Sequence, residues 1–221
     1  MRLPRSVRAV IFDMDGVLLD TERFYTQATQ EIVGRYGKTF DWTLKQHMIG
    51  RQALPAARFL VETLALPLSP EEYLAECGRL LRDLMPQANA TPGAVDLTGA
   101  LAAHRVPQAI ASSSPTHLYE RKSMRHREWF RVFDAIVLGD DPRIVHGKPA
   151  PDIFLLAADL LGVAARECVV VEDSPAGVTA AHAAGMQAIA VPDPAMDRAR
   201  FADAELIIDS LTMIAPADLG L

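Results

Sequence analysis

Short apolar runs recur along the chain and are separated by segments whose apolar residues have helical spacing. In the first run, residues 7–12, only Arg8 is polar, which is typical of a strand buried on both faces. Similar runs lie at 107–111, 135–138, 167–171 and 187–191. Because helical segments separate these runs, the pattern predicts an α/β fold with a doubly wound parallel sheet of the Rossmann-like kind.

A long helical stretch follows the first predicted strand. Helical patterns cover 21–36, 43–48, 55–64 and 69–86, and no strand pattern interrupts them. Such a stretch is too long for a simple crossover between two parallel strands. We therefore expect an α/β core made of residues 1–20 and 87–221, with a small all-helical domain inserted at 21–86.

Polar residues follow the predicted strands at the points where the strands end. Because ligands bind at the carboxyl ends of the strands in a doubly wound sheet, these residues are expected to converge. They are Asp13 and Asp15, Ser112 to Ser114, Asp140 and Asp141, and Glu172 and Asp173, with Lys148 in a nearby loop. Asp140 and Asp141 precede a proline, and we favour a plain turn for them over a catalytic role.

A cluster of carboxylates needs a positive partner. Several carboxylates at one sheet edge are costly unless a cation neutralises them. Oxygen ligands of this kind suit Mg²⁺, which commonly binds through a few carboxylates, water and a substrate phosphate. Lys148 and the hydroxyl of Ser112 would then interact with the phosphate oxygens. The pattern favours a site for a small phosphorylated molecule and Mg²⁺.

Composition and charge narrow the possible partners. The chain has 221 residues, half of them hydrophobic, and a formal net charge of −6. An acidic protein is a poor partner for nucleic acid, which needs basic patches. No apolar stretch has the length of a signal peptide core or a membrane span. We expect a cytoplasmic monomer or weak homo-oligomer that binds a small phosphorylated metabolite and neither nucleic acid nor a membrane.

The ordered set of motifs resembles the haloacid dehalogenase superfamily. Asp-Met-Asp-Gly-Val at 13–17 looks like the first signature of that family, and Ser112 like the second. Lys148 in Gly-Lys-Pro-Ala-Pro-Asp looks like the third signature. Glu172-Asp173 in Val-Val-Val-Glu-Asp-Ser looks like the fourth. Each motif alone is weak, but all four occur in the family's order and span nearly the whole chain.

The resemblance implies catalytic roles. Asp13 would attack phosphorus and form an aspartyl-phosphate. Asp15 would protonate the leaving oxygen and later deprotonate the attacking water. Ser112 would hold a phosphate oxygen together with the backbone N–H of Ser113, and Lys148 would pair with Asp13 and the phosphoryl group.

The resemblance also implies a magnesium site. The Asp13 side chain, the Asp15 backbone carbonyl and Asp173 would bind Mg²⁺. Glu172 would reach the metal directly or through water, and the sequence leaves these two alternatives open.

The helical insert resembles the small cap domain found in part of the superfamily. Glu22 and Arg51 are its candidate substrate-binding residues, with a surface role for Arg51 an equal alternative. Within the capped group, the chain is similar to pseudouridine 5′-phosphatase-like proteins. The similarity lies in residues 12–25, 35–36, 137–142 and 146–155. It implies hydrolysis of a nucleoside-type monophosphate such as pseudouridine 5′-phosphate.

Three other activities share parts of this pattern. A sugar phosphomutase of the β-phosphoglucomutase type shares all four signatures, but such mutases carry a histidine where this chain has Tyr25. A haloalkanoate dehalogenase needs neither Asp15 nor a metal. A phospho-accepting receiver module, which is not an enzyme, is shorter and has no helical insert. A magnesium-dependent phosphatase is therefore the favoured interpretation.

Overall fold

A computed structural model describes residues 3–49 and 53–220 of the chain, which form two compact units. The sheet unit contains the described residues up to Asp20 and from Asn89 onward. The helical unit contains the described residues of Thr21–Ala88. The assignment of these segments as a hydrolase core and a cap stays a prediction.

The sheet unit is built on six parallel strands in the order β3-β2-β1-β4-β5-β6. The chain moves outward from β1 to β3, then returns to the other side of β1 with β4, so the order reverses between β1 and β4. Such a switch point leaves a crevice at the carboxyl ends of the two strands. The strands are β1 (Ala9–Phe12), β2 (Gln108–Ser112), β3 (Ala135–Leu138), β4 (Cys168–Glu172), β5 (Gln187–Ala190) and β6 (Leu206–Ile207).

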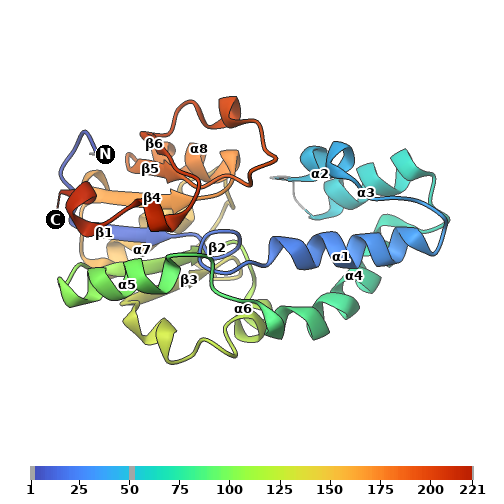
Figure 1. Ribbon diagram of the computed structural model, residues 1–221, viewed down its shortest axis with the longest axis horizontal. Helices are drawn as coiled ribbons and strands as arrows, with labels where there is room; N and C mark the ends of the chain where they lie inside the picture. Colours follow the sequence, from blue (N-terminus) through green and yellow to red (C-terminus); the bar gives the residue numbers. More distant parts are fainter. Residues whose placement is uncertain (1–2, 50–52, 221) are drawn as a thin grey trace. The chain divides into compact units, whose positions relative to one another are not determined.

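Helices flank this sheet (Figure 1). Helix α7 packs against β1, β2 and β3, α8 packs against β4 and β5, and the two helices touch each other, while α5 packs against β2. Every residue of β1, β2, β4 and β5 is buried, as expected for inner strands of a covered parallel sheet. The helices are α5 (Ala94–Ala103), α6 (Thr116–Lys122), α7 (Asp152–Leu161) and α8 (Pro175–Ala183).

Short 3-10 helices complete the sheet unit. They are η2 (Trp129–Val132), η3 (Ala165–Glu167), η4 (Arg198–Phe201), η5 (Leu211–Met213) and η6 (Pro216–Leu219).

The helical unit has its own core. Helix α4 packs against α1 and α3, and α2 packs against α3. Ser69 and Glu72 form a capping box that fixes the start of α4, with both side chains bonded to backbone N–H groups. Between α1 and α4, the hydroxyls of Thr29 and Tyr73 share a buried 2.8 Å hydrogen bond. The elements are α1 (Glu22–Gly34), α2 (Trp42–Met48), α3 (Ala53–Leu64), α4 (Pro70–Leu84) and η1 (Met85–Gln87).

The predicted fold class, a doubly wound parallel α/β sheet, is confirmed. Five predicted strands correspond to β1–β5: β3 has the predicted bounds, and the other four differ by one or two residues at their ends. The two-residue strand β6 was not predicted from the sequence. No helix in the described part of the chain combines the length and apolar character needed to cross a membrane.

Candidate active site

Asp13 is held at the end of β1, where the sequence places it. Its backbone N–H donates to the carbonyl of Val171 in β4 at 2.9 Å, which continues the pairing of the two strands by one residue. Its side chain is buried, with the whole residue 7 % exposed. The central strand pair therefore fixes this carboxylate at the switch point of the sheet.

Lys148 ties Asp13 to Glu172. The Lys148 ammonium donates to Asp13 Oδ1 at 2.5 Å, to Glu172 Oε1 at 2.7 Å and to the carbonyl of Ala111 at 3.0 Å. Three acceptors match the three N–H donors of an ammonium. The ammonium also lies 4.8 Å from the centre of the Phe154 ring. One lysine thus connects the ends of β1, β2 and β4.

Burial and charge shift the protonation equilibria of this cluster. Burial raises the pKa of Asp13, Lys148 opposes the rise, and the charges of Glu172 and Asp15 add to it, so that the pKa is about 7. Burial alone would lower the pKa of Lys148, but the charges of Asp13 and Glu172 more than offset it and hold the pKa above its usual value. Lys148 is therefore a permanent cation beside Asp13.

Glu172 is buried and bonded through both of its oxygens. Oε1 accepts from Lys148, and Oε2 accepts from the backbone N–H of Ser174 at 3.0 Å and from its hydroxyl at 2.9 Å. A Cβ added to Gly177, in the first turn of α8, would lie 1.8 Å from the Glu172 carboxyl carbon. The glycine therefore makes room for this carboxylate.

Asp173 lies directly against the loop after β1. An ideal Cβ on Gly16 would lie only 2.1 Å from Asp173 Oδ2, and Gly16 has a φ of +77°, which favours glycine. The sequence Asp-Gly at 15–16 is therefore more than a turn, because the glycine permits close approach of a carboxylate to the loop. Asp173 thus lies beside Gly16, the residue that follows Asp15.

Asp15 is bound by a residue that the sequence analysis missed. Lys122, the last residue of α6, donates to Asp15 Oδ1 at 2.6 Å and to Oδ2 at 2.8 Å. The hydroxyl of Ser114 lies 2.7 Å from the same ammonium and donates to Asp15 Oδ2 at 3.0 Å. The Ser114 backbone N–H in turn donates to the hydroxyl of Ser112 at 3.2 Å. We call Asp15, Lys122 and Ser114 the Asp15 cluster.

The remaining strand-end residues have structural partners. Ser112 is fully buried at the end of β2, whereas Ser113 is exposed and its carbonyl packs against Gly139.

Asp140 accepts hydrogen bonds from the backbone N–H and hydroxyl of Thr116, so it caps α6. Asp141 pairs with Arg143 through two hydrogen bonds from its guanidinium.

The predicted insert residues, Glu22 and Arg51, are described by the structure only in part. Glu22 begins α1 in the helical unit and lies 3.3 Å from the ammonium of Lys45. Arg51 lies outside the described residues. A role for either residue in substrate binding stays a prediction.

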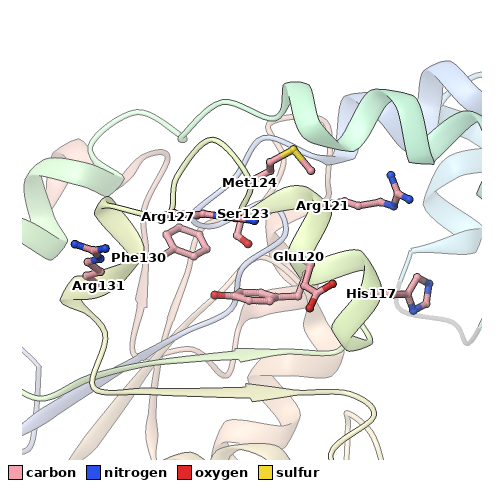
Figure 2. Close-up of a pocket in the computed structure, with 9 residues that line it drawn as sticks. His117, Glu120, Arg121, Ser123, Met124, Arg127, Phe130 and Arg131 are labelled. Atoms are coloured by element: carbon pink, nitrogen blue, oxygen red, sulfur yellow. The ribbon is translucent and has the colours of Figure 1, made fainter.

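A hollow of about 630 Å³ lies on the outer side of α6 and η2 (Figure 2). Arg131 and His117 lie at opposite ends of it, and Arg121 and Ser123 contribute from α6 and its C-cap. Lys122 lies between these last two in sequence but is fully buried and bound to Asp15. None of the predicted catalytic residues lines this hollow.

The donor set at the strand ends fits a hard divalent cation. The carboxylates of Asp13, Asp15, Glu172 and Asp173 follow the ends of β1 and β4, and oxygen ligands of this kind suit such a cation. Among the residues that the structure describes, no three His, Cys, Asp or Glu side chains group as a metal site. Mg²⁺ is commonly bound by one or two carboxylates with water and substrate phosphate, so two side chains and one carbonyl suffice.

A buried lysine shared by carboxylates at the ends of two strands, at the switch point of a parallel sheet, is typical of an enzyme site that binds an anion. A family model for haloacid dehalogenase-like hydrolases matches residues 7–185. The chain belongs to this family, and it is an enzyme of the phosphatase class within it. The predicted family is thereby confirmed.

Similar proteins cover nearly the whole chain. "Probable pseudouridine-5'-phosphatase" of Drosophila melanogaster is 46% identical over 220 residues, which cover 98% of this chain and 95% of the relative. (DL)-glycerol-3-phosphatase 2 of Arabidopsis thaliana is 44% identical over 221 residues, covering 98% and 92%. The crystal structure of a HAD family hydrolase from Deinococcus radiodurans, with bound phosphate and sodium, has a TM-score of 0.80 and 26% identity. That match covers 97% of this chain and 96% of the other.

The sequence contains a weak indication that Lys122 is buried. Lys122 is spaced three and four residues after Tyr119 and Leu118, which places it on the apolar side of a short helix. A lysine on such a face must find a buried partner or extend past its neighbours to water. The partner, Asp15, lies 107 residues earlier in the chain, and helical spacing does not identify it.

Proposed function

We propose that the protein is a Mg²⁺-dependent phosphatase that hydrolyses a small phosphomonoester through an aspartyl-phosphate on Asp13. The observation that carries this proposal is the buried Asp13 carboxylate at the end of β1, held by Lys148 and placed two residues before Asp15. To attack an anionic phosphoryl group, a carboxylate must be held in a fixed orientation, and nearby positive charge must offset the repulsion between the two anions. The contacts of Asp13 supply both.

In the first step, an Asp13 oxygen attacks phosphorus. The new O–P bond forms as the P–O bond to the leaving group breaks. Lys148 holds the Asp13 carboxylate in place and offsets the charge that gathers on the phosphoryl oxygens. Glu172 keeps the Lys148 ammonium at this position from the opposite side.

Asp15 acts as the acid in the first step and as the base in the second. Its carboxyl group gives a proton to the leaving oxygen and then takes a proton from water. That water attacks phosphorus, the bond to Asp13 breaks, and inorganic phosphate leaves. The Asp15 side chain is 21% exposed, so part of the carboxyl group is accessible to a reacting molecule.

Ser112 and the backbone N–H of Ser113 hold the phosphate oxygens. Ser112 ends β2, beside the carbonyl of Ala111 that accepts from Lys148. A hydroxyl and an N–H group at a strand end can both donate to an anionic oxygen. We assign these two donors to substrate binding.

Asp13, the carbonyl of Asp15 and Asp173 would hold Mg²⁺. When bound, the cation offsets negative charge on the phosphoryl group. Both oxygens of Glu172 are engaged by Lys148 and Ser174, and we therefore assign Glu172 a water-mediated role at the metal.

The substrate is a small phosphorylated metabolite. Pseudouridine 5′-phosphate is the first candidate, because the Drosophila relative is named as a phosphatase for that compound and is 46% identical. Glycerol 3-phosphate is the second, because the Arabidopsis relative is named for it at 44% identity. We assign Glu22 and Arg51 to recognition of the leaving group.

Phosphate release from a panel of phosphomonoesters tests this function. The purified protein with Mg²⁺ should hydrolyse at least one compound of the panel, and EDTA should abolish the activity. Pseudouridine 5′-phosphate should be hydrolysed faster than sugar phosphates. Activity that survives EDTA would contradict the metal requirement, and conversion of a sugar phosphate to its isomer without free phosphate would indicate a mutase.

A further inference from the structure

The Asp15 cluster stands out among the buried charges of the sheet unit. Lys122 is fully buried, yet it lies at the end of a helix of seven residues whose outer side faces solvent. A buried ammonium is tolerated only with close acceptors. Its ammonium donates to the two oxygens of Asp15 and to the hydroxyl of Ser114.

We propose that Lys122, with Ser114, is a positioning residue that fixes the carboxyl group of Asp15 for proton transfer to the leaving oxygen. This inference rests on the proposed function, in which Asp15 is the acid and base. Asp15 lies in the loop after β1, and its side chain accepts hydrogen bonds from both other members of the Asp15 cluster. Lys122 and Ser114 therefore set the direction of its oxygens.

The hydrogen bonds of the cluster restrict Asp15 to one orientation. The ammonium contacts both carboxylate oxygens, at 2.6 and 2.8 Å, and so fixes the plane of the group. Ser114 bonds to Oδ2 only, which distinguishes the two oxygens. Rotation of the side chain would break two or three charge-assisted hydrogen bonds at once.

The cluster also connects proton transfer with phosphate binding. The backbone N–H of Ser114 donates to the hydroxyl of Ser112, the residue assigned to the phosphate. The position of the Asp15 side chain is thus coupled through Ser114 to the end of β2. A misplacement of about 1 Å in such a group can cost about 10²-fold in rate.

The test compares two kinds of leaving group in Lys122→Met. An alkoxide is a strong base and needs the proton from Asp15, whereas p-nitrophenolate is a weak base and leaves without it. The value of kcat/KM includes the departure of the leaving group and excludes the later hydrolysis of the intermediate. For the alkyl phosphomonoester that the wild type hydrolyses fastest, kcat/KM should fall about 10²-fold. For p-nitrophenyl phosphate it should fall less than about 10-fold.

A double variant shows whether Lys122 acts through Asp15. In an Asp15→Asn background, Lys122→Met should cause little further loss of kcat/KM on the alkyl substrate. The effects of substituting residues that act as one unit are not additive. Equal losses with both leaving groups, or an undiminished loss in the Asp15→Asn background, would overturn the inference. Arg125→Met removes an exposed cation three positions further along and is the matched control, expected to leave both kcat/KM values unchanged.

Thermal unfolding will show whether Lys122→Met folds. If it does not, Ser114→Ala provides the test instead. It removes one hydrogen bond to Asp15 and keeps the ion pair, so the alkyl substrate should lose roughly 5- to 10-fold and p-nitrophenyl phosphate less. Equal losses in Ser114→Ala would again overturn the inference. A wild-type protein that hydrolyses neither substrate would instead overturn the proposed function itself.

Discussion

Asp13 and Asp15, which follow β1 two residues apart, each pair with a lysine from another part of the sheet unit. The two ion pairs differ in how far they are buried. Asp13 and Lys148 are both nearly inaccessible, and the lysine is shared with a second buried carboxylate, Glu172. In the pair of Asp15 and Lys122, the lysine is fully buried but the carboxylate is partly exposed. The first pair is enclosed, and the second exposes part of its carboxylate to solvent.

Because of this difference in burial, we expect removal of the two lysines to affect stability and activity to different extents. Removing Lys148 leaves two buried carboxylates without their common cation, which is costly to the fold. Removing Lys122 leaves one carboxylate that solvent can reach. We therefore expect a larger loss of stability at Lys148 and a more selective loss of activity at Lys122.

Asp13→Asn gives the largest expected effect. The amide lacks the nucleophilic carboxylate oxygen, so kcat should fall at least about 10⁴-fold on every substrate. Phosphate release measures the loss, and thermal unfolding should show that the variant still folds. A variant that keeps substantial activity would contradict the role assigned to Asp13.

Lys148→Met should reduce both activity and stability. The buried negative charges of Asp13 and Glu172 would then lie unpaired, so the free energy of unfolding should fall by about 3–5 kcal/mol. Urea unfolding measures it, with Lys122→Met as the comparison, for which a smaller loss is expected. Adding Glu172→Gln to Lys148→Met should restore part of the stability, and no recovery would argue against a shared cation.

Gly16→Ala tests the approach of Asp173 to the loop. The added Cβ would collide with the Asp173 carboxylate and also strain a residue with positive φ. The Mg²⁺ concentration needed for half-maximal activity should rise about 10- to 100-fold, as when the support of a metal ligand is removed. An unchanged Mg²⁺ requirement would show that Asp173 does not hold the metal.

Gly99→Ala is the control for Gly16→Ala and has the smallest expected effect. Gly99 lies inside α5, and a Cβ there would meet nothing within 4 Å. The free energy of unfolding should rise by about 0.5–1 kcal/mol, with no change in activity or Mg²⁺ requirement. A loss of activity would indicate that glycine substitutions disturb the site unspecifically.

The sequence predicted one of the two lysine pairs and not the other. Lys148 was identified because its loop carries a family motif, and Asp13 and Asp15 because polar residues directly follow a buried apolar run. Lys122 belongs to no such motif, and its helical spacing indicates a buried cation without identifying its partner. Such a contact depends on the packing of a helix against a distant loop, which local patterns do not specify.

The same limit applies to the fold. Inner strands were predicted because their sequences are mostly apolar, as expected for strands buried on both faces. The edge strand β6 has two residues, Leu206 and Ile207, which are only half-buried and too few to form a periodic pattern. Its pairing with β5 comes from the tertiary arrangement of the C-terminal segment.

The most direct test of the central claim is the mass of the protein during turnover. Wild-type enzyme mixed with Mg²⁺ and its best substrate, then quenched in acid, should gain the mass of one phosphoryl group. Peptide mapping should place that group on Asp13. Asp13→Asn treated in the same way should gain nothing. A phosphoryl group on another residue, or the same gain in mass in Asp13→Asn, would contradict the account.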